Sequence, residues 1–177
     1  YPVKSLKGSF RSILFGIIPF GSRYMRKHPV FTIVTVIFHI CILMLPVFLL
    51  AHIILWYESF NILWWSIPEH LADTMTVFVI FSCLFFLIRR FTVPETKRVS
   101  DIGDFLLLAL IITPFITGFL ATHHLGPYRP FLIMHIISGE LLLITIPFSK
   151  LGHMLLFWLS RTYMGSEFGE VLDAKDW

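Results

Sequence analysis

Four long apolar stretches constrain this chain more than any other feature of its sequence. They run from Val30 to Tyr57, from about Leu71 to Ile88, from Phe105 to Thr122, and from Phe131 to about Leu159. A helix needs about 20 apolar residues to cross the bilayer core. Spans of a β-barrel would alternate apolar and polar residues over about 10 positions, whereas these stretches are continuous. We therefore predict an all-α integral membrane protein, a helical bundle with four transmembrane helices visible.

The composition excludes several other classes of protein. Only 14% of the residues are charged, and 56% are hydrophobic, whereas a soluble domain carries about 25% charged residues. A disordered chain, a nucleic-acid arm and an ordinary cytosolic enzyme are therefore excluded, and the surroundings must be a lipid bilayer. Cys41 and Cys83 both lie inside apolar stretches, so we expect no disulfide framework and no cysteine-ligated cluster or zinc site.

A basic segment, residues 1–29, precedes the first span. Its apolar residues recur at helical spacing, with Lys7 and Arg11 on other faces: Leu6, Phe10, Ile13, Leu14, Ile17 and Ile18. This pattern predicts a helix lying in the membrane interface and stopped by Pro19; the alternative is an irregular linker. The predicted domains are this segment, a four-span domain over residues 30–160, and a cytoplasmic tail over residues 161–177.

The positions of Lys and Arg predict the orientation. Thirteen of the fourteen basic residues fall on one side of the predicted membrane, and only Arg129 falls on the other. Short cytoplasmic loops hold the excess of positive charge. We therefore expect a multi-pass protein of a bacterial or archaeal inner membrane with both ends of this chain cytoplasmic. The net charge of +3 reflects this asymmetry and implies no nucleic-acid partner.

Four histidines lie within the predicted spans, His39 and His52 in the first and His135 and His153 in the fourth. A titratable ring inside a membrane is a functional hypothesis by default. Eighteen residues separate His135 from His153, which is five whole turns and about 27 Å on one face of a helix. Because the two spans are antiparallel, His39 pairs with His153 near the cytoplasm and His52 with His135 near the periplasm.

Two cross-helix histidine pairs at two depths are what two stacked haems require. The alternative is four unrelated histidines, each hydrogen-bonded to a neighbouring helix. One feature resists the haem interpretation, because thirteen residues on a straight helix leave His39 and His52 about 140° apart. Pro46 lies between them, and a kink there would realign the two rings.

The stretch from His135 to His153, with Pro147-Phe148-Ser149-Lys150 ahead of its second histidine, resembles the last span of the respiratory nitrate reductase gamma subunit. That family has two haem-ligating histidines with the same separation. Phe38-His39-Ile40-Cys41 resembles the start of its other ligand helix. The family has a further span ahead of this helix. Here that span is absent, either because the chain is truncated or because the subfamily lacks it.

The chain resembles still more closely the b-type cytochrome subunits of transmembrane redox complexes in sulfate-reducing bacteria. The resemblance lies in Arg26-Lys27-His28-Pro29, in Leu50-Ala51-His52 and in the stretch from Tyr163 to Gly169. It implies two haem b groups held by His39, His52, His135 and His153. It also implies a cytoplasmic iron–sulfur partner related to heterodisulfide reductase, a periplasmic multihaem cytochrome c and other membrane subunits.

The same resemblance suggests roles for several further residues. Menaquinol would be oxidised beside the periplasmic haem, where Glu140 would either accept a proton or stay protonated and bond a neighbouring helix. His70 and Asp73 would complete that pocket or cap the second span. Gly139 would admit the porphyrin or serve simple helix packing. The candidate propionate ligands at the periplasmic haem are Arg129, His123 and His124. At the cytoplasmic haem they are Arg89 and Arg90. The alternative for these two arginines is that they dock a partner subunit or contact lipid headgroups.

The expected function is therefore that of a dihaem cytochrome b subunit of a respiratory redox complex. It would carry electrons across the membrane between menaquinol, or a periplasmic cytochrome c, and a cytoplasmic iron–sulfur subunit. It would be an electron-transfer subunit, with or without a quinone site of its own. The alternative is a haem-free membrane anchor or a proton-conducting subunit, in which the histidines and Glu140 form a relay.

Overall fold

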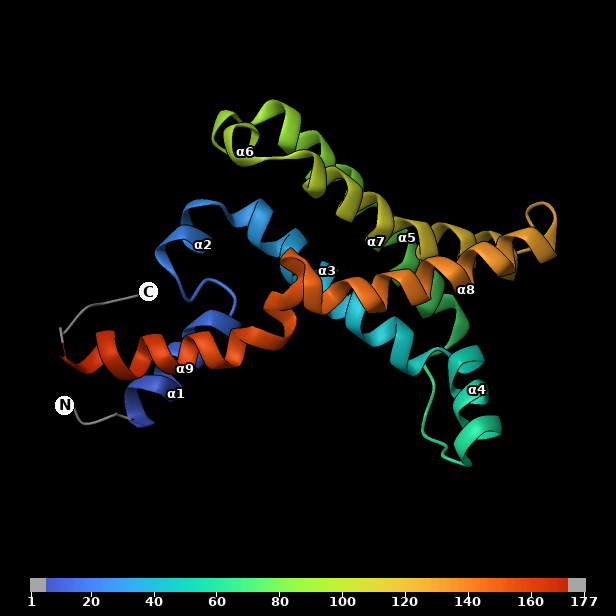
Figure 1. Ribbon diagram of the computed structural model, residues 1–177, viewed down its shortest axis with the longest axis horizontal. Helices are drawn as coiled ribbons and strands as arrows, with labels where there is room; N and C mark the ends of the chain where they lie inside the picture. Colours follow the sequence, from blue (N-terminus) through green and yellow to red (C-terminus); the bar gives the residue numbers. More distant parts are fainter. Residues whose placement is uncertain (1–5, 172–177) are drawn as a thin grey trace. The chain divides into compact units, whose positions relative to one another are not determined.

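The computed structural model describes residues 6–171, with side chains as far as residue 167. Within that range all regular structure is helical and no strand occurs, as predicted (Figure 1). The helices are α1 (Leu6–Ile17), α2 (Arg23–Lys27), α3 (Pro29–Phe48), α4 (Leu50–Phe60), α5 (Glu69–Thr92), α6 (Pro94–Val99), α7 (Ile102–Thr122), α8 (Tyr128–Thr145) and α9 (His153–Val171). Two 3₁₀ turns, η1 (Ile146–Phe148) and η2 (Lys150–Gly152), lie between α8 and α9.

Four helical segments are long and apolar enough to cross a membrane: Pro29–Phe48, Glu69–Thr92, Ile102–Thr122 and Tyr128–Phe148. At most 22% of the most apolar part of each segment is buried inside the protein, so the remaining apolar side chains need lipid around them. Helices satisfy their own backbone hydrogen bonds, which is why they can stand in lipid. The chain is therefore a multi-pass membrane protein, and the predicted number of four spans is confirmed, whereas the first and the fourth span end earlier than predicted. The side on which the chain ends lie stays a prediction.

The structure contains two compact units. One combines the N-terminal residues through Val36 with the C-terminal residues from Ile144, and the other runs from Ile37 to Leu143. The predicted domain boundaries at residues 29 and 160 follow the membrane rather than the contacts within the chain, and they stay a prediction.

In the second unit, α5 packs against α7. Several of the residues buried there are small or hydroxylic, such as Ser82 and Cys83 on α5 and Thr117 and Ala121 on α7. Small residues let transmembrane helices approach closely. The buried hydroxyls are satisfied locally, because Ser82 donates to the carbonyl of Phe78 at 2.8 Å and Thr117 to a carbonyl one turn earlier. These two buried hydroxyls therefore both have hydrogen-bond partners within their own helices.

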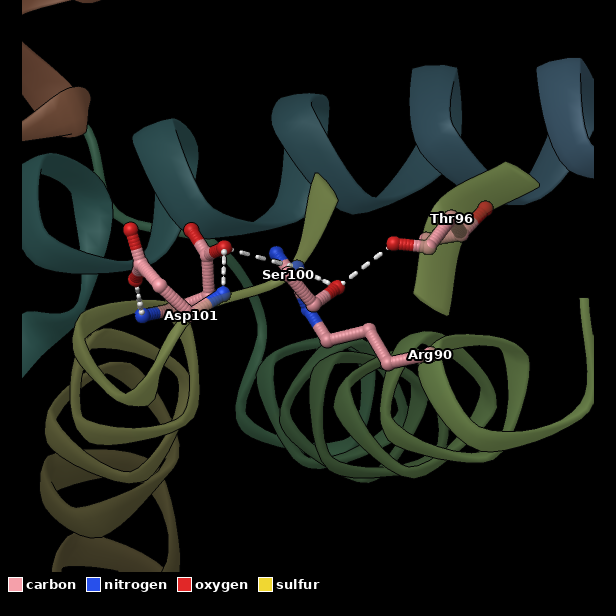
Figure 2. Close-up of polar contacts among 5 residues, drawn as sticks. Arg90, Thr96, Ser100 and Asp101 are labelled. Carbon is pink, nitrogen blue, oxygen red and sulfur yellow. Dashed lines mark hydrogen bonds and ion pairs between the residues drawn. The ribbon is translucent and has the colours of Figure 1, made fainter. Parts of the chain in front are cut away.

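A polar cluster closes the α5–α6–α7 turn (Figure 2). The guanidinium of Arg90 lies 3.2 Å from the carboxylate of Asp104 and donates to the hydroxyl of Ser100 at 2.9 Å. Asp101 and Asp104 form a capping box at the start of α7, each side chain accepting the other's backbone N–H. Asp104 is buried, so these donors compensate the charge that it brings out of water.

The first predicted span is interrupted between α3 and α4. Pro46 lies in the last turn of α3, and Leu49 is extended with φ −73° and ψ 131°. The last four carbonyls of α3 all accept a hydrogen bond, Leu45 from its ordinary helical donor four residues on and the other three from donors outside the helix. The acceptor–donor pairs are Leu45 with the Leu49 amide (3.1 Å), Pro46 with the His52 imidazole (3.0 Å), Val47 with the Trp64 indole (3.0 Å) and Phe48 with the Ile67 amide (2.9 Å). The expected distortion near Pro46 is thus a complete break that the protein has fully hydrogen-bonded.

In the first unit, α1 packs along α9 (Figure 1). Gly165 of α9 lies so close to Gly8 and Ser12 of α1 that any Cβ would overlap them. The hydroxyl of Ser9 donates to the carbonyl of Thr162 at 2.9 Å. The helix predicted from the apolar residues between positions 6 and 18 is therefore confirmed, and the irregular linker was wrong.

The fourth predicted span does not continue to Leu159. α8 ends at Thr145, and the following residues form two 3₁₀ turns around an extended Ser149 (φ −130°, ψ −177°). Pro147 has no N–H to donate and its ring clashes with the preceding turn, so an α-helix cannot run through it undisturbed. The prediction that His135 and His153 share one face of a continuous helix was therefore wrong.

Candidate functional site

Two histidine side chains lie side by side in the second unit, His52 from α4 and His135 from α8. Their ring centres are 5.9 Å apart, and their planes differ by only 7°. Both side chains are partly buried. These are the two histidines that depth alone paired at the predicted periplasmic side, and the structure brings them together.

His52 is held by the break between α3 and α4. It sits in the first turn of α4, and its Nδ1 lies 3.0 Å from the carbonyl oxygen of Pro46. That carbonyl belongs to the last turn of α3, where the ordinary helical donor is missing because Leu49 is extended. The imidazole thus serves as the donor that the interrupted helix lacks, and the break fixes its orientation.

His135 is held by α7. Its Nδ1 lies 2.8 Å from the carbonyl oxygen of Pro114, and the ring rests against Gly118, one turn further along that helix. A Cβ at Gly118 would lie 2.8 Å from Nδ1 and 2.9 Å from Cε1 of His135, closer than carbon and nitrogen atoms pack. Gly118 therefore opens a notch in α7 that only a residue without a side chain can provide.

The two hydrogen bonds also set the chemistry of the two rings. A carbonyl oxygen only accepts, so each Nδ1 must carry the proton and each Nε2 keeps its lone pair. A metal-ligating histidine commonly has this arrangement, with its second ring nitrogen bonded to a carbonyl. His52 and His135 are thus two imidazoles in the tautomer that can ligate through Nε2.

The two rings offer a donor set of two imidazoles, each with its Nδ1 bonded to a carbonyl oxygen. Among the described residues no three His, Cys, Asp or Glu side chains gather as a metal site. Neutral imidazoles are ligands that haem iron accepts, so the chemistry of this donor set fits a haem.

Gly139 and Glu140 follow His135 on α8. Gly139 is one turn away and about 40° round the helix from His135, whereas Glu140 is about 140° round. A Cβ built at Gly139 would meet nothing within 4 Å, so the space beside this glycine is open, and its two proposed roles, porphyrin approach and helix packing, both stay predictions. Glu140 is exposed. Their roles toward porphyrin and quinol stay predictions.

The second predicted pair is divided between the two units. His39, partly buried on α3, lies beside Phe38, with ring centres 5.5 Å apart and planes nearly perpendicular. His153 opens α9, and its Nδ1 lies 2.9 Å from the carbonyl of Lys150. Because His39 belongs to the second unit and His153 to the first, their pairing stays a prediction.

His123 and Asp73, both proposed for the periplasmic end, bind each other. Nε2 of His123 lies 3.0 Å from the carboxylate of Asp73, and each side chain is about a third exposed. The N-cap of α5 is Pro68, without a side-chain hydrogen bond, so the capping role for His70 and Asp73 was wrong. His70 and Arg129 are exposed, and their roles at a quinone or a propionate stay predictions.

Arg90, proposed for the cytoplasmic end, is engaged within the protein. Its contacts with Asp104 and Ser100 (Figure 2) close the turn between α5 and α7. A propionate or a partner subunit would have to compete with this carboxylate for the guanidinium.

Comparison with known proteins gives one clear relative. A protein of Nitratidesulfovibrio vulgaris (strain Hildenborough) is 38% identical over 163 residues, which are 92% of this chain and 72% of that protein. The chain belongs to the same family as that protein. The relative carries only the name "Protein", which states no ligand and no activity. No family model and no solved structure match the chain.

Three residues that help to build the site were missed by the sequence analysis: Pro114, Gly118 and Trp64. Pro114 and Gly118 are four residues apart in an apolar helix, a spacing that places them on one face. That spacing was a readable signal for a place where another side chain approaches the backbone. The role of Trp64 depends on a loop folding back onto α3, for which the sequence holds no local signal.

Proposed function

We propose that this chain is a dihaem b membrane subunit of a respiratory redox complex. It transfers electrons across the membrane between menaquinol, or a periplasmic cytochrome c, and a cytoplasmic iron–sulfur subunit. The proposed location is a bacterial or archaeal inner membrane, with both chain ends in the cytoplasm. The relative from a sulfate-reducing bacterium is consistent with the resemblance to redox-complex subunits of such organisms.

The observation that carries the proposal is the parallel pair of His52 and His135, with ring centres 5.9 Å apart. Two proline carbonyls orient the rings, that of Pro46 at the break between α3 and α4 and that of Pro114 inside α7. Each ring bonds a main-chain carbonyl of another helix through Nδ1, as histidines that only join helices would also do. In a neutral ring this bond leaves the lone pair of Nε2 for a metal, and the parallel arrangement of the two rings is what favours a shared ligand.

The chain's own contribution is to bind, orient and insulate. His52 and His135 would ligate one haem, and His39 and His153 a second one nearer the cytoplasm. Haem, when bound, supplies one-electron chemistry, and two haems at different depths divide the crossing into shorter steps. The hydrogen bonds to Pro46 and Pro114 hold the ligands in place, because such partners fix the tautomer and ring orientation of a ligating histidine.

A quinol site would lie beside the haem at His135. Glu140 and His70 are its candidate proton acceptors, and both are exposed, so a quinol approaching from the lipid can reach them. Gly139 leaves space on the face that carries His135, which would let the porphyrin lie close to α8. Arg129 would then hold a propionate at the periplasmic surface.

The test is a dithionite-reduced minus oxidised spectrum of the purified full chain, with a pyridine haemochrome assay of haem b per chain. We expect two haems per chain. His52→Ala and His135→Ala should each remove the same haem, and His39→Ala and His153→Ala the other one. His28→Ala is the matched control, since His28 is exposed at the end of α2 and has no proposed role toward haem, and it should keep both.

The other outcomes contradict the proposal in distinct ways. One haem per chain, lost only in the His52 and His135 variants, would refute the pairing of His39 with His153. No haem b at all would refute the cytochrome proposal and leave the membrane anchor or the proton-conducting subunit as the function.

A further inference from the structure

The α1–α9 pair distributes its side chains in the opposite way to a pair of helices in water. Small residues line much of its contact surface, where Ser9, Ser12 and Ser166 are at most 8% exposed and the ring of Phe157 lies against Gly16. Many of its large apolar side chains instead point outward, with Leu6 84%, Leu159 68% and Phe10 65% exposed. Helices associate through small residues where lipid, rather than water, surrounds them, so the medium around this pair is apolar on at least one side.

α9 itself does not cross the membrane. It carries Arg161 and Glu167 and does not belong to the four helices that are apolar enough to do so. The last spanning segment ends at Phe148 and α9 begins at His153. Five residues reach at most about 18 Å even when fully extended, so α9 begins close to the membrane surface at which that span ends.

The same unit carries a strong positive charge. By sequence its two ranges hold nine basic residues against four acidic ones. The basic residues are Lys4, Lys7, Arg11, Arg23, Arg26, Lys27, Lys150, Arg161 and Lys175, and the acidic ones are Glu167, Glu170, Asp173 and Asp176. Basic residues beside apolar ones are typical of helices that lie in the headgroup region. Each Lys or Arg near an anionic surface contributes about 1 kcal/mol to binding it.

We propose that α1 and α9 together form a single two-helix element lying in the interface of one leaflet, and that it binds anionic phospholipid. The outward apolar side chains enter the upper acyl region, and the basic side chains, Lys7 and Arg11 among them, bind lipid phosphates. The close contact at Gly165 joins the two helices, so neither end of the described chain enters the bilayer on its own.

Contact between α1 and α9 also carries a topological consequence. An even number of spans separates the two helices, so both must lie at the same membrane surface, and their packing is possible only in that arrangement. The proposal thus accounts for the burial of small residues, the exposure of large ones and the charge of the unit at once. It does not depend on haem.

The first test measures depth in the membrane. Spin labels are placed at Leu6→Cys and Leu159→Cys in full-length protein, in vesicles of phosphatidylcholine and phosphatidylglycerol. Cys41 and Cys83 are at most 4% exposed and should stay unlabelled. Relative accessibility to oxygen and to a water-soluble nickel chelate gives the depth. Ile137→Cys in α8 is the deep control, and Lys97→Cys in α6 is the water control.

Both labels should report similar depths between the two controls, about 5–10 Å below the headgroup boundary. A label at Leu159→Cys as open to nickel as that at Lys97→Cys would overturn the proposal, since α9 would then stand in water. A depth equal to that of Ile137→Cys would also overturn it, because α9 would then continue the span.

The second test measures lipid selectivity. Spin-labelled phosphatidylglycerol should bind more weakly to the Lys7→Gln/Arg11→Gln variant, by up to about fivefold per charge removed, while phosphatidylcholine is unaffected. Lys97→Gln/Arg98→Gln removes two charges from α6 in the other unit and is the matched control. Equal losses in both variants, or none in the first, would refute a specific role for this unit.

Discussion

Replacing Gly118 by alanine should destabilise the protein by displacing the His135 ring. The new Cβ would lie 2.8 Å from Nδ1, whereas ordinary Cβ contacts begin near 3.4 Å, so the ring must move by at least about half an ångström. That movement breaks or lengthens the 2.8 Å hydrogen bond to Pro114, which costs about 1 kcal/mol. Overpacking adds about 1–3 kcal/mol. The expected loss is about 2–4 kcal/mol.

Gly139→Ala is the matched substitution, because its Cβ would meet no atom within 4 Å. Both changes place alanine in a transmembrane helix, so differences in helix propensity cancel between them. The assay is the free energy of unfolding of haem-free protein in a titration with sodium dodecyl sulfate, so that the role proposed for Gly139 beside the porphyrin does not enter the comparison. We expect Gly118→Ala to be less stable than Gly139→Ala by about 2–4 kcal/mol. Equal stabilities would refute the inference that Gly118 makes room for the imidazole.

Three further predictions concern other contacts. Asp104→Ala should lower the free energy of unfolding by about 2–3 kcal/mol. This loss is smaller than that for breaking a fully buried ion pair, because a quarter of the Arg90 side chain is exposed. Detergent titration measures the loss, and a value under about 0.5 kcal/mol would contradict the prediction. A double-mutant cycle on Asp73 and His123 should give a coupling of about 0.2–1 kcal/mol that weakens with added salt, and a coupling of zero would disagree. Gly165→Leu should increase the distance between spin labels on α1 and α9, measured by pulsed electron resonance. Gly152→Ala, whose Cβ would make only an ordinary 3.5 Å contact, should leave that distance unchanged.

Hydropathy predicted the middle of the fold well and its helix ends less well. The second and third spans were expected over 71–88 and 105–122, and the helices run over Glu69–Thr92 and Ile102–Thr122. The added turns contain Arg89, Arg90 and Asp104, which a count of apolar residues leaves out. Arg90 and Asp104 bind each other across the turn, a contact that hydropathy does not register.

The fourth span shows where a continuous apolar run misleads. Ile146, Pro147 and Phe148 keep the run apolar, yet Pro147 prevents an α-helix from continuing through it. Pro147 therefore marked the end of this helix, which hydropathy did not. Pro46 likewise marked the distortion that was expected in the first span. The end of a span is thus better predicted from backbone donors than from side-chain polarity.

The candidate site could also be predicted only in part. Membrane depth sufficed to pair His52 with His135, because antiparallel spans bring equal depths together. The carbonyl partners could not be foreseen, since one depends on the break between α3 and α4 and the other on which residues of α7 face α8. Gly118 depends on the azimuth of α7 relative to α8, which a single sequence does not specify.

The hydrogen bonds at the end of α3 have a consequence for how the protein is made. The carbonyls of Val47 and Phe48 bind Trp64 and Ile67, residues that the ribosome adds only after α4 is complete. Until then the break at Leu49 lacks these donors. We therefore expect α3 and α4 to enter the membrane as one continuous helix, in which the same carbonyls accept from amides four residues further on. The imidazole of His52 therefore reaches its final position only when the loop after α4 has been translated and has folded back. A site built this way is completed late in biosynthesis, after its first histidine has already entered the bilayer.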